Sequence, residues 1–515
     1  MMICLTRTAV TATLVLISFT GLATLPIVAS QEMPRPFHIQ VIDSVTQRGV
    51  PLVQIRTVNH IRLVTDSWGN IAFDEPGLMN QRVFFFVSSD GYEYPKDRFG
   101  FRGVALNIRP GGKAIIKVDR TNVAERLYRV TGAGIYRDTK LLSLQPPIKQ
   151  GLVNANVLGS DSVINATYKN KLYWFWGDTN RPGYPLGNFH VPGAVSQLPG
   201  IAKTGPDNGI DLVYFVDEKT GFAKETAKMP GKGPTWVFGL TVLKESGKER
   251  LLATYNKVKP PMEIYERGVI QFRDSKQRFD KLTSFPHDVK LFASGHPVTH
   301  VDEGEEYLYF PTPYPLVRVP ATYKDYQNPS SYQAYTCLKE GARADQFEVE
   351  HDPTGKAIFK WRFDVIPWSE KLQKRLLQEG KIKNSDAIIE TRDVDTQRPI
   401  SIHGSSIYFN EFRNRWIMIG LEQFGTSPLG EIWYLESKDF HGPWNRAKKI
   451  VSHNKYSFYN PKQHPMFAHD NYIYFEGTYT TMFSAESTPT PRYNYNQIMY
   501  RLDLTHSKLE QVQSD

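Results

Sequence analysis

The chain has 515 residues, enough for two or three domains with a large buried core. Aromatic residues make up 13% of it, and it has no low-complexity tract or long charge run, which excludes a mainly disordered protein. The formal net charge is +9, but Lys and Arg are not clustered as in nucleic-acid-binding proteins, so we expect no nucleic acid as partner. The charge favours anionic partners such as acidic polysaccharides or lipid headgroups, although it also serves solubility alone.

Residues 1–30 have the pattern of a secretory signal peptide, with one charge at Arg7, an apolar stretch and small residues at Val28–Ser30. The alternative is an uncleaved membrane anchor. No later stretch has the ~20 apolar residues needed to span a bilayer. We therefore expect a secreted or periplasmic protein without a transmembrane segment after cleavage. Only Cys337 would then remain, which excludes an internal disulfide and leaves the oligomeric state open.

The first folded segment, residues 35–120, consists of short strands separated by turns. Phe37–Asp43 alternates apolar and polar residues, Gln47–Gly49 marks a turn, and Thr65–Gly69 marks a second turn before another strand. This punctuation resembles the carboxypeptidase-regulatory, transthyretin-like β-sandwich. The resemblance implies an accessory module that spaces, docks or binds, and we assign it no chemistry.

From residue 125 to 510, a short strand, a turn and a very apolar aromatic strand recur five times. The aromatic strands are Leu172–Trp176, Arg250–Tyr255, Tyr307–Phe310, Trp416–Ile419 and Tyr472–Phe475. Tandem antiparallel units of this kind are typical of propeller blades. The sequence therefore predicts an all-β chain, a small β-sandwich followed by a five-bladed β-propeller. The irregular spacing leaves a six- or seven-bladed propeller or a large sandwich as alternatives.

Two segments fall outside the five copies. Residues 355–400 are interpreted as an insertion after the third copy, with a helix between an N-cap at Ser369 and a stop at Gly380. Residues 127–136 alternate in part and precede the first copy. Because the last copy leaves little chain for an outer strand, we expect this segment to complete the final blade and remove an exposed edge.

One short stretch carries a family resemblance. Glu431–Ser437, followed by Gly442-Pro443-Trp444, resembles the third strand and following turn of five-bladed-propeller glycoside hydrolases, the arabinanase, xylosidase and invertase group. The resemblance implies an exported carbohydrate-active protein that hydrolyses a glycan, with a polysaccharide or oligosaccharide as its partner.

The direction of propeller strands predicts which side chains meet. The innermost strand of each blade runs down from the top face and the second strand returns, so first-strand starts and second-strand ends gather around the axis on that face. First-strand starts place there Asp161, Trp236, His296, His403 and His464. Second-strand ends place there Asp178, Asn256, Glu422 and Glu476. Each residue alone is equally explained by turn capping or by a packed hydrogen bond, and only their convergence favours a site.

Glycoside hydrolysis needs two carboxylates, about 5–5.5 Å apart for retention or about 6.5–9.5 Å for inversion. Asp161 stands where the propeller glycosidases carry the catalytic Asp of their first blade. The resemblance therefore implies that Asp161 is the base or nucleophile, with Glu476 or Glu422 as the acid. The other acids of that group stand at later inner-strand starts, which here read Gly295-His296-Pro297 and Ile402-His403-Gly404, so the chain departs from the group there.

Asp178 is a further catalytic candidate. Its setting, Trp176-Gly177-Asp178-Thr179, is similar to the Phe-Gly-Asp-Thr of propeller enzymes that cut arabinofuranose polymers. Sugars are held by aromatic stacking and planar polar groups. The candidate sugar-binding side chains are Trp176, Trp236, Asn256, His296, His403, His464, Arg492 and Tyr493.

Three histidines support other classes of function. His296, His403 and His464 around one axis could hold a divalent metal, or one of them could serve as the base of a polysaccharide lyase. No cofactor is required by the sequence. A lyase or metal-dependent enzyme and a non-catalytic glycan- or envelope-binding propeller stay open, because a propeller fold does not decide function.

Overall fold

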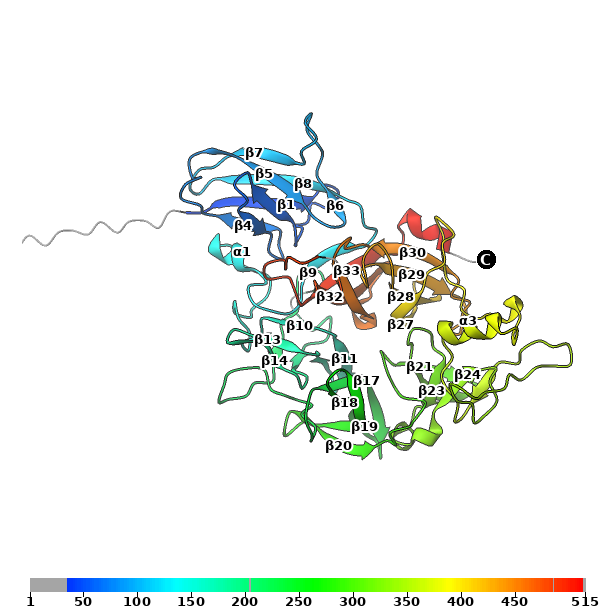
Figure 1. Cartoon of the computed structure of the whole chain (residues 1–515). Coiled ribbons are helices and arrows are strands. Elements are labelled where there is room, and N and C mark those ends of the chain that lie inside the picture. Colours follow the sequence, from blue (N-terminus) through cyan, green and yellow to red (C-terminus); the bar gives the residue numbers. More distant parts are fainter. Residues whose placement is uncertain (1–34, 203–204, 485, 513–515) are drawn as a thin grey trace, which may run out of the picture.

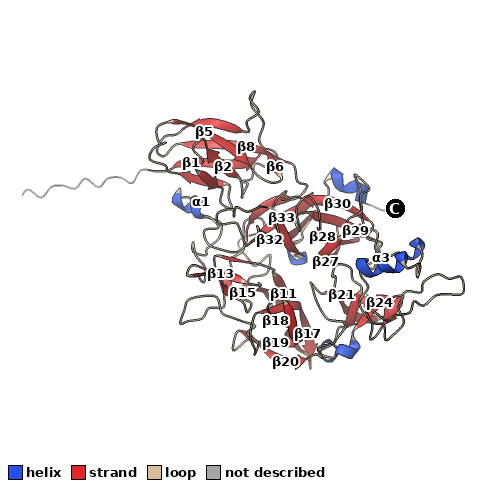
Figure 2. Cartoon of the chain, in the orientation of Figure 1, coloured by secondary structure: helices blue, strands red, loops and turns tan. Residues whose placement is uncertain are grey.

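The computed structural model describes residues 35–202, 205–484 and 486–512, and the signal-peptide pattern at 1–30 lies outside them. The chain is built almost entirely of strands, with few short helices (Figure 2). A sandwich of sheets packs beside a ring of sheets (Figure 1). The predicted all-β architecture is confirmed. Within the described ranges, no helix has the length and apolar character needed to cross a membrane.

The sandwich consists of two four-stranded sheets with orders β4-β1-β8-β6 and β3-β2-β5-β7. Their strands are β1 (Phe37–Asp43), β2 (Gln54–Thr57), β3 (Arg62–Val64), β4 (Asn70–Phe73), β5 (Arg82–Ser88), β6 (Tyr92–Glu93), β7 (Gly103–Asn107) and β8 (Lys113–Arg120). The strands alternate, so that Ile39, Ile55 and Phe85 are fully buried between the sheets.

The ring has five antiparallel sheets, described as blades one to five. Blade one contains β11 (Ile164–Tyr168), β12 (Lys171–Phe175), β15 (Gly193–Ser196) and β16 (Val213–Tyr214). Blade two contains β17 (Thr235–Glu245), β18 (Lys248–Lys259), β19 (Glu263–Arg273) and β20 (Arg278–Ser284). Blade three contains β21 (Val298–Asp302), β22 (Glu305–Tyr309), β23 (Val317–Pro320), β24 (Gln333–Thr336) and β25 (Lys360–Arg362).

Blade four contains β27 (Ile402–Asn410), β28 (Arg415–Glu422), β29 (Ile432–Ser437), β30 (Arg446–Val451) and a parallel edge strand, β26 (Arg392–Asp393). Blade five contains β31 (Ser457–Gln463), β32 (Tyr472–Thr480), β33 (Asn496–Asp503) and β9 (Glu125–Arg129). β10 (Gly159–Ser160), β13 (Thr179–Arg181) and β14 (Tyr184–Asn188) form a further small sheet. Along the chain, β10 precedes β11, and β13 and β14 follow β12.

The ring is closed by the segment between the sandwich and blade one. β9 pairs antiparallel with β33, with Arg129 opposite Ile498, and the Val130 N–H donates to the Gln497 carbonyl at 2.8 Å. The expected completion of the final blade is confirmed. The strand is shorter than expected, because Gly132 and Gly134 adopt positive φ and turn the chain toward α1 (Arg137–Leu141).

The remaining helices are short: α2 (Tyr323–Tyr326), η1 (Pro329–Ser331), α3 (Glu370–Gln378), η2 (Asn384–Asp386), η3 (Pro465–Phe467) and η4 (Ser507–Val512). The helix expected between the third and fourth copies is α3. Its N-cap, Ser369, accepts a hydrogen bond from the Leu372 N–H, and Gly380 follows its end at φ +65°.

The fifth copy was located wrongly from the sequence. The segment expected as its inner strand, residues 463–467, is the end of β31 followed by η3. A bulge breaks the pairing between Tyr459 and Lys462, where Asn460 has φ +52° and Pro461 follows. Asn and Pro inside a strand read as a turn in sequence, although they also mark bulges.

This shift moves two candidate residues. His464 lies at the lower end of the inner strand, and Glu476 stands opposite Lys462 in the middle of β32. Both therefore lie deep along the axis, and the expectation that they belong to the top face is wrong.

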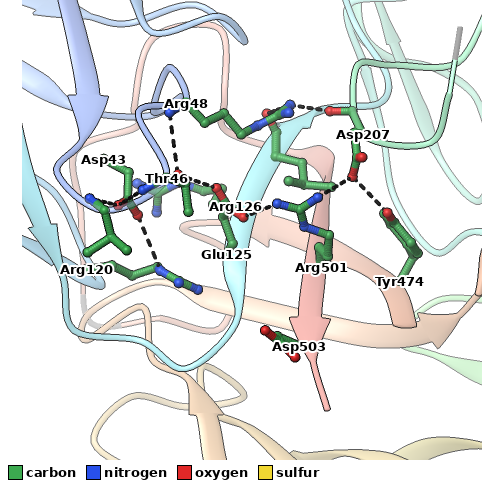
Figure 3. A network of polar contacts seen from close by, with 12 residues as sticks. Asp43, Thr46, Arg48, Arg120, Glu125, Arg126, Asp207, Tyr474, Arg501 and Asp503 are labelled. Atoms are coloured by element: carbon green, nitrogen blue, oxygen red, sulfur yellow. Dashed lines mark hydrogen bonds and ion pairs between the residues drawn. The ribbon is translucent and has the colours of Figure 1, made fainter. Parts of the chain in front are cut away.

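The sandwich is fixed to the ring by polar contacts (Figure 3). Arg501 of β33 binds Glu125 of β9 at 2.6 Å and Asp207 at 2.9 Å. The Tyr474 hydroxyl donates to the Asp207 carboxylate at 2.8 Å, and Arg48 of the sandwich donates to the Asp207 carbonyl. Charges from the sandwich, the connecting strand and the last blade thus form one network.

Candidate functional site

Two carboxylates lie next to each other at the top of blade one. The β10–β13 pairing ends with Ser160 opposite Thr179, and Asp161 and Asp178 are the residues directly beyond this last pair. The Asp161 N–H donates to the Asp178 carbonyl at 3.3 Å, and the Gly177 N–H donates to the Asp161 carbonyl at 2.7 Å. Asp161 and Asp178 are therefore neighbours, and their role in a site stays a prediction.

Different neighbouring groups shift the pKa values of the two carboxyls. Burial raises the pKa of Asp161, but the Tyr459 hydroxyl donates to its Oδ2 at 2.6 Å, and Tyr495 adds a second hydrogen bond that opposes the rise. Burial, and then the negative charge of Asp161, raise the pKa of Asp178 to about 7. Asp178 therefore holds its proton below about pH 7, while the tyrosine hydroxyls favour the charged form of Asp161 against the effect of burial.

Tyr459 and Tyr495 were missed in the sequence. Tyr495 lies in the aromatic stretch 490–497, two residues after the candidate Tyr493. Tyr459 lies on β31, ahead of residues 463–467, which were expected to form this inner strand. The exposed ring of Phe483 contacts Tyr459 edge-on, with a centroid distance of 5.7 Å. The carboxylate pair is therefore bordered by aromatic side chains from blade five.

Arg492 and Tyr493 face away from this pair. The Tyr493 hydroxyl donates to the Thr65 carbonyl of the sandwich at 2.8 Å, and its buried ring lies under the Arg129 guanidinium. Arg492 lies 3.5 Å from the Asp138 carboxylate. Tyr493 thus fastens the sandwich to blade five and is too buried to contact a sugar, whereas the exposed Arg492 binds Asp138 of α1.

A second polar cluster is buried on the axis. His464 Nε2 lies 3.2 Å from Glu476 Oε1, and its Nδ1 lies 2.9 Å from the Asn165 amide. Burial raises the pKa of Glu476 to about 8 and lowers the pKa of His464 well below its usual value. The distance is that of an ion pair, but both shifts favour the neutral forms, and we interpret the contact as a neutral one. Lys462 lies nearby and donates to the Tyr408 hydroxyl at 2.7 Å.

The three histidines do not converge. His296 is buried near Lys462 and His464, and burial with the Lys462 charge lowers its pKa well below the usual value. His403 is exposed beside α3, at a cavity of about 740 Å³. Among residues 35–202, 205–484 and 486–512, no three His, Cys, Asp or Glu side chains form a group that could hold a metal.

Glu422 is occupied by structural partners. Arg398 donates to both of its carboxylate oxygens, at 2.5 and 3.1 Å, and the Trp433 indole donates to Oε2 at 2.9 Å. The side chain is buried under this cover. A carboxylate held in this way cannot reach a glycosidic oxygen without breaking a bidentate ion pair.

The remaining candidates lie in blades one and two. Trp176 is 1% exposed and lies between Trp174 and Tyr214, so it is a core residue and cannot stack on a sugar. Trp236 and Asn256 face each other across β17 and β18, as the strand-direction argument predicts, and Trp236 is partly exposed.

One cavity, of about 710 Å³, lies away from Asp161 and Asp178. It is lined by Lys171, Val195 and Phe467, near the hairpin at the end of blade one opposite to Asp161. Its lining carries no paired carboxylates, so the candidate site is defined by the chemistry of Asp161 and Asp178 rather than by cavity size.

No family model and no curated protein matches the chain. Among solved structures, it is similar to an exo-1,5-α-L-arabinanase from a bovine ruminal metagenomic library, with 10% identity over 68% of this chain and 95% of that chain and a TM-score of 0.34. It is also similar to a GH43_1 enzyme from Xanthomonas citri complexed with xylotriose, with 10% identity over 69% and 88% of the chains and a TM-score of 0.32. An exo-β-1,3-galactanase from Phanerochaete chrysosporium shows 9% identity over 73% and 64% and a TM-score of 0.36. Likenesses at this level carry no argument, so the architecture and the site rest on the chain's own sheets and side chains.

Proposed function

We propose that the chain hydrolyses a glycosidic bond at the top of blade one, with Asp178 as general acid and Asp161 as base or nucleophile. The observation that carries the proposal is the pair of neighbouring carboxyls, of which Asp161 receives hydrogen bonds from tyrosine hydroxyls. Two neighbouring carboxyls whose surroundings separate their protonation states are the arrangement that glycoside hydrolysis requires.

The chemistry follows from these protonation states. The Asp178 carboxyl donates its proton to the glycosidic oxygen as the bond to the anomeric carbon breaks. The Asp161 carboxylate either takes a proton from the attacking water or bonds to the anomeric carbon and is later released by water. In both cases one water is consumed, and Tyr459 and Tyr495 hold the Asp161 carboxylate in place.

Asp178 replaces the acids that we expected from the sequence. Glu476 has no exposed surface, and Glu422 is enclosed by Arg398 and Trp433. A general acid must come within hydrogen-bond reach of the leaving oxygen. Asp178 is partly exposed and has a raised pKa of about 7, which supports this role. The proposal includes export, supported by the signal-peptide pattern at residues 1–30.

The test uses the full mature chain and a panel of α-1,5-arabinan, β-1,3-galactan and xylan, with release of reducing ends as the readout. Asp161→Asn and Asp178→Asn should each lower cleavage at least ~100-fold, the lower end of the contribution of general acid–base catalysis. Asp288→Asn, at an exposed aspartate on the loop before blade three, is the matched control and should cleave normally. Binding of a glycan without cleavage by the unmodified chain, or equal activity in all three variants, would overturn the proposal.

A further inference from the structure

The outer face of one sandwich sheet carries an aromatic strip. In β5, Val83, Phe85 and Val87 point into the sandwich core, so Phe84 and Phe86 point to the opposite face. The sheet β3-β2-β5-β7 is the layer of the sandwich whose strands β5 and β7 lie away from the ring (Figure 1).

The rings of this strip form one continuous surface. Phe84 and Phe86 meet edge-on with centroids 5.1 Å apart, and Phe86 meets Phe101 in the same way at 5.8 Å. Phe101 is 52% exposed. Gly103 stands opposite Phe86, and a Cβ there would lie 2.6 Å from Cζ of Phe84, so this glycine allows the ring to lie close against β7. Such a joined set of one exposed and two partly exposed rings differs from scattered surface apolar residues.

On the strands of this face, arginines stand beside the rings. The Arg56 guanidinium lies 4.3 Å from the Phe86 ring centre, and Arg62 stands opposite Arg56 on β3. Arg82 is exposed at the start of β5, on the same face as Phe84. The outward positions of β2, β3, β5 and β7 thus hold three arginines and no Asp or Glu. The face is complementary to a negative charge.

We propose that this face, defined by Phe84, Phe86, Phe101, Arg56 and Arg62, binds an anionic polysaccharide. The sugar rings lie against the phenylalanines, and the arginines pair with carboxylates along the chain. A polysaccharide fits the face because aromatic rings and planar guanidinium groups, the two kinds of group that hold sugars, lie side by side there. The one acid of the neighbouring loop tip, Asp97, accepts from the Phe99 and Phe101 N–H groups, and binding to a lipid surface is separated from binding to a polysaccharide by the test below. The site is separate from the carboxylate pair and does not depend on hydrolysis.

The test measures binding of the full chain to polygalacturonate, by affinity electrophoresis and calorimetry, with neutral dextran as the comparison. Phe101→Ala should weaken binding about fivefold, within the range expected for a lost aromatic contact. Phe412→Ala is the matched control, because Phe412 is also 52% exposed but lies between β27 and β28 of blade four. Arg56→Gln should weaken binding severalfold, and added salt should weaken it further. Arg109→Gln, at an exposed arginine before β8, should not.

The outcomes separate this site from the carboxylate pair. Asp178→Asn should bind polygalacturonate as the unmodified chain does, whether or not the chain proves to be a hydrolase. Equal losses in Phe101→Ala and Phe412→Ala would overturn the proposal, as would binding to dextran with the same affinity. Binding to phosphatidylglycerol vesicles or to a polyglutamate peptide, with no binding to polygalacturonate, would also overturn it.

Discussion

Replacing Glu476 with glutamine should make the protein more stable at neutral and alkaline pH. Glu476 has no exposed surface, and burial raises its pKa from 4.5 to about 8. The nearby Lys462 charge opposes that rise but does not cancel it. Glutamine keeps the shape of the side chain and removes the titrating group, so the free energy of unfolding should lose its dependence on this carboxyl.

The magnitude follows from the two protonation states. Between about pH 4.5 and pH 8 the folded chain holds a proton on Glu476 that the unfolded chain has released. The free energy of unfolding of the unmodified chain therefore falls as pH rises through this window, by about 1.4 kcal/mol per pH unit and by about 5 kcal/mol in total. Glu476→Gln should match the unmodified chain near pH 5 and exceed it near pH 8.

Urea denaturation followed by tryptophan fluorescence at pH 5, 6, 7 and 8 measures this difference. Glu422→Gln is the matched control, since Glu422 is also a buried glutamate of a second blade strand but is ion-paired with Arg398. That variant keeps Glu476, so its free energy of unfolding should still fall between about pH 4.5 and pH 8. Parallel pH curves for Glu476→Gln and the unmodified chain would refute the reasoning and show that Glu476 is ionised in the fold.

Three further predictions concern the site and the sandwich. The kcat/KM for cleavage should fall about tenfold per pH unit above about pH 7, where Asp178 loses its proton. Asp178→Asn should lack this alkaline limb of the pH profile. A profile that stays flat to pH 9 would contradict Asp178 as the acid. Gly177→Ala should lower cleavage about 100-fold, because its Cβ would lie 2.0 Å from Asp161 Oδ1, while Gly183→Ala, with open space around it, should not. Arg126→Met should lower the free energy of unfolding by about 3 kcal/mol, measured by urea denaturation, because Arg126 is 1% exposed and donates at 3.0 Å to the Pro51 and Asp90 carbonyls of the sandwich. An unchanged free energy of unfolding would show that these contacts do not hold the sandwich.

Much of the fold could be predicted because its signals are local. Short windows of the sequence show the aromatic strands and the helix between Ser369 and Gly380. They also show that too little chain follows the last copy to form its outer strand, which β9 supplies. The fifth blade could not be located, because Asn460 and Pro461 interrupt its inner strand with a bulge. Whether a proline ends a strand or bulges it depends on neighbouring strands, which a short window does not contain.

The site was predictable where strand direction alone decides position. Asp161 and Asp178 are neighbours because each stands directly beyond the last pair of β10 and β13, and no side-chain detail is needed for that. The burial of Trp176 and Tyr493 could not be predicted, because the groups that cover them, Tyr214 and Thr65, are far away in sequence. The same holds for Tyr459, whose contact with Asp161 crosses from the last blade to the first.

The pairing of β9 with β33 has a consequence for the order of folding. Thr131 and Asn496 are hydrogen-bonded at 2.9 Å although 365 residues separate them, so the last blade stays incomplete until almost the whole chain has been synthesised. The sandwich, whose contacts are local, can fold while the ribosome is still translating the propeller. Because the strand that follows the sandwich is itself part of blade five, ring closure also stops the sandwich from swinging. A polymer held on the sandwich would then always meet the propeller at one angle.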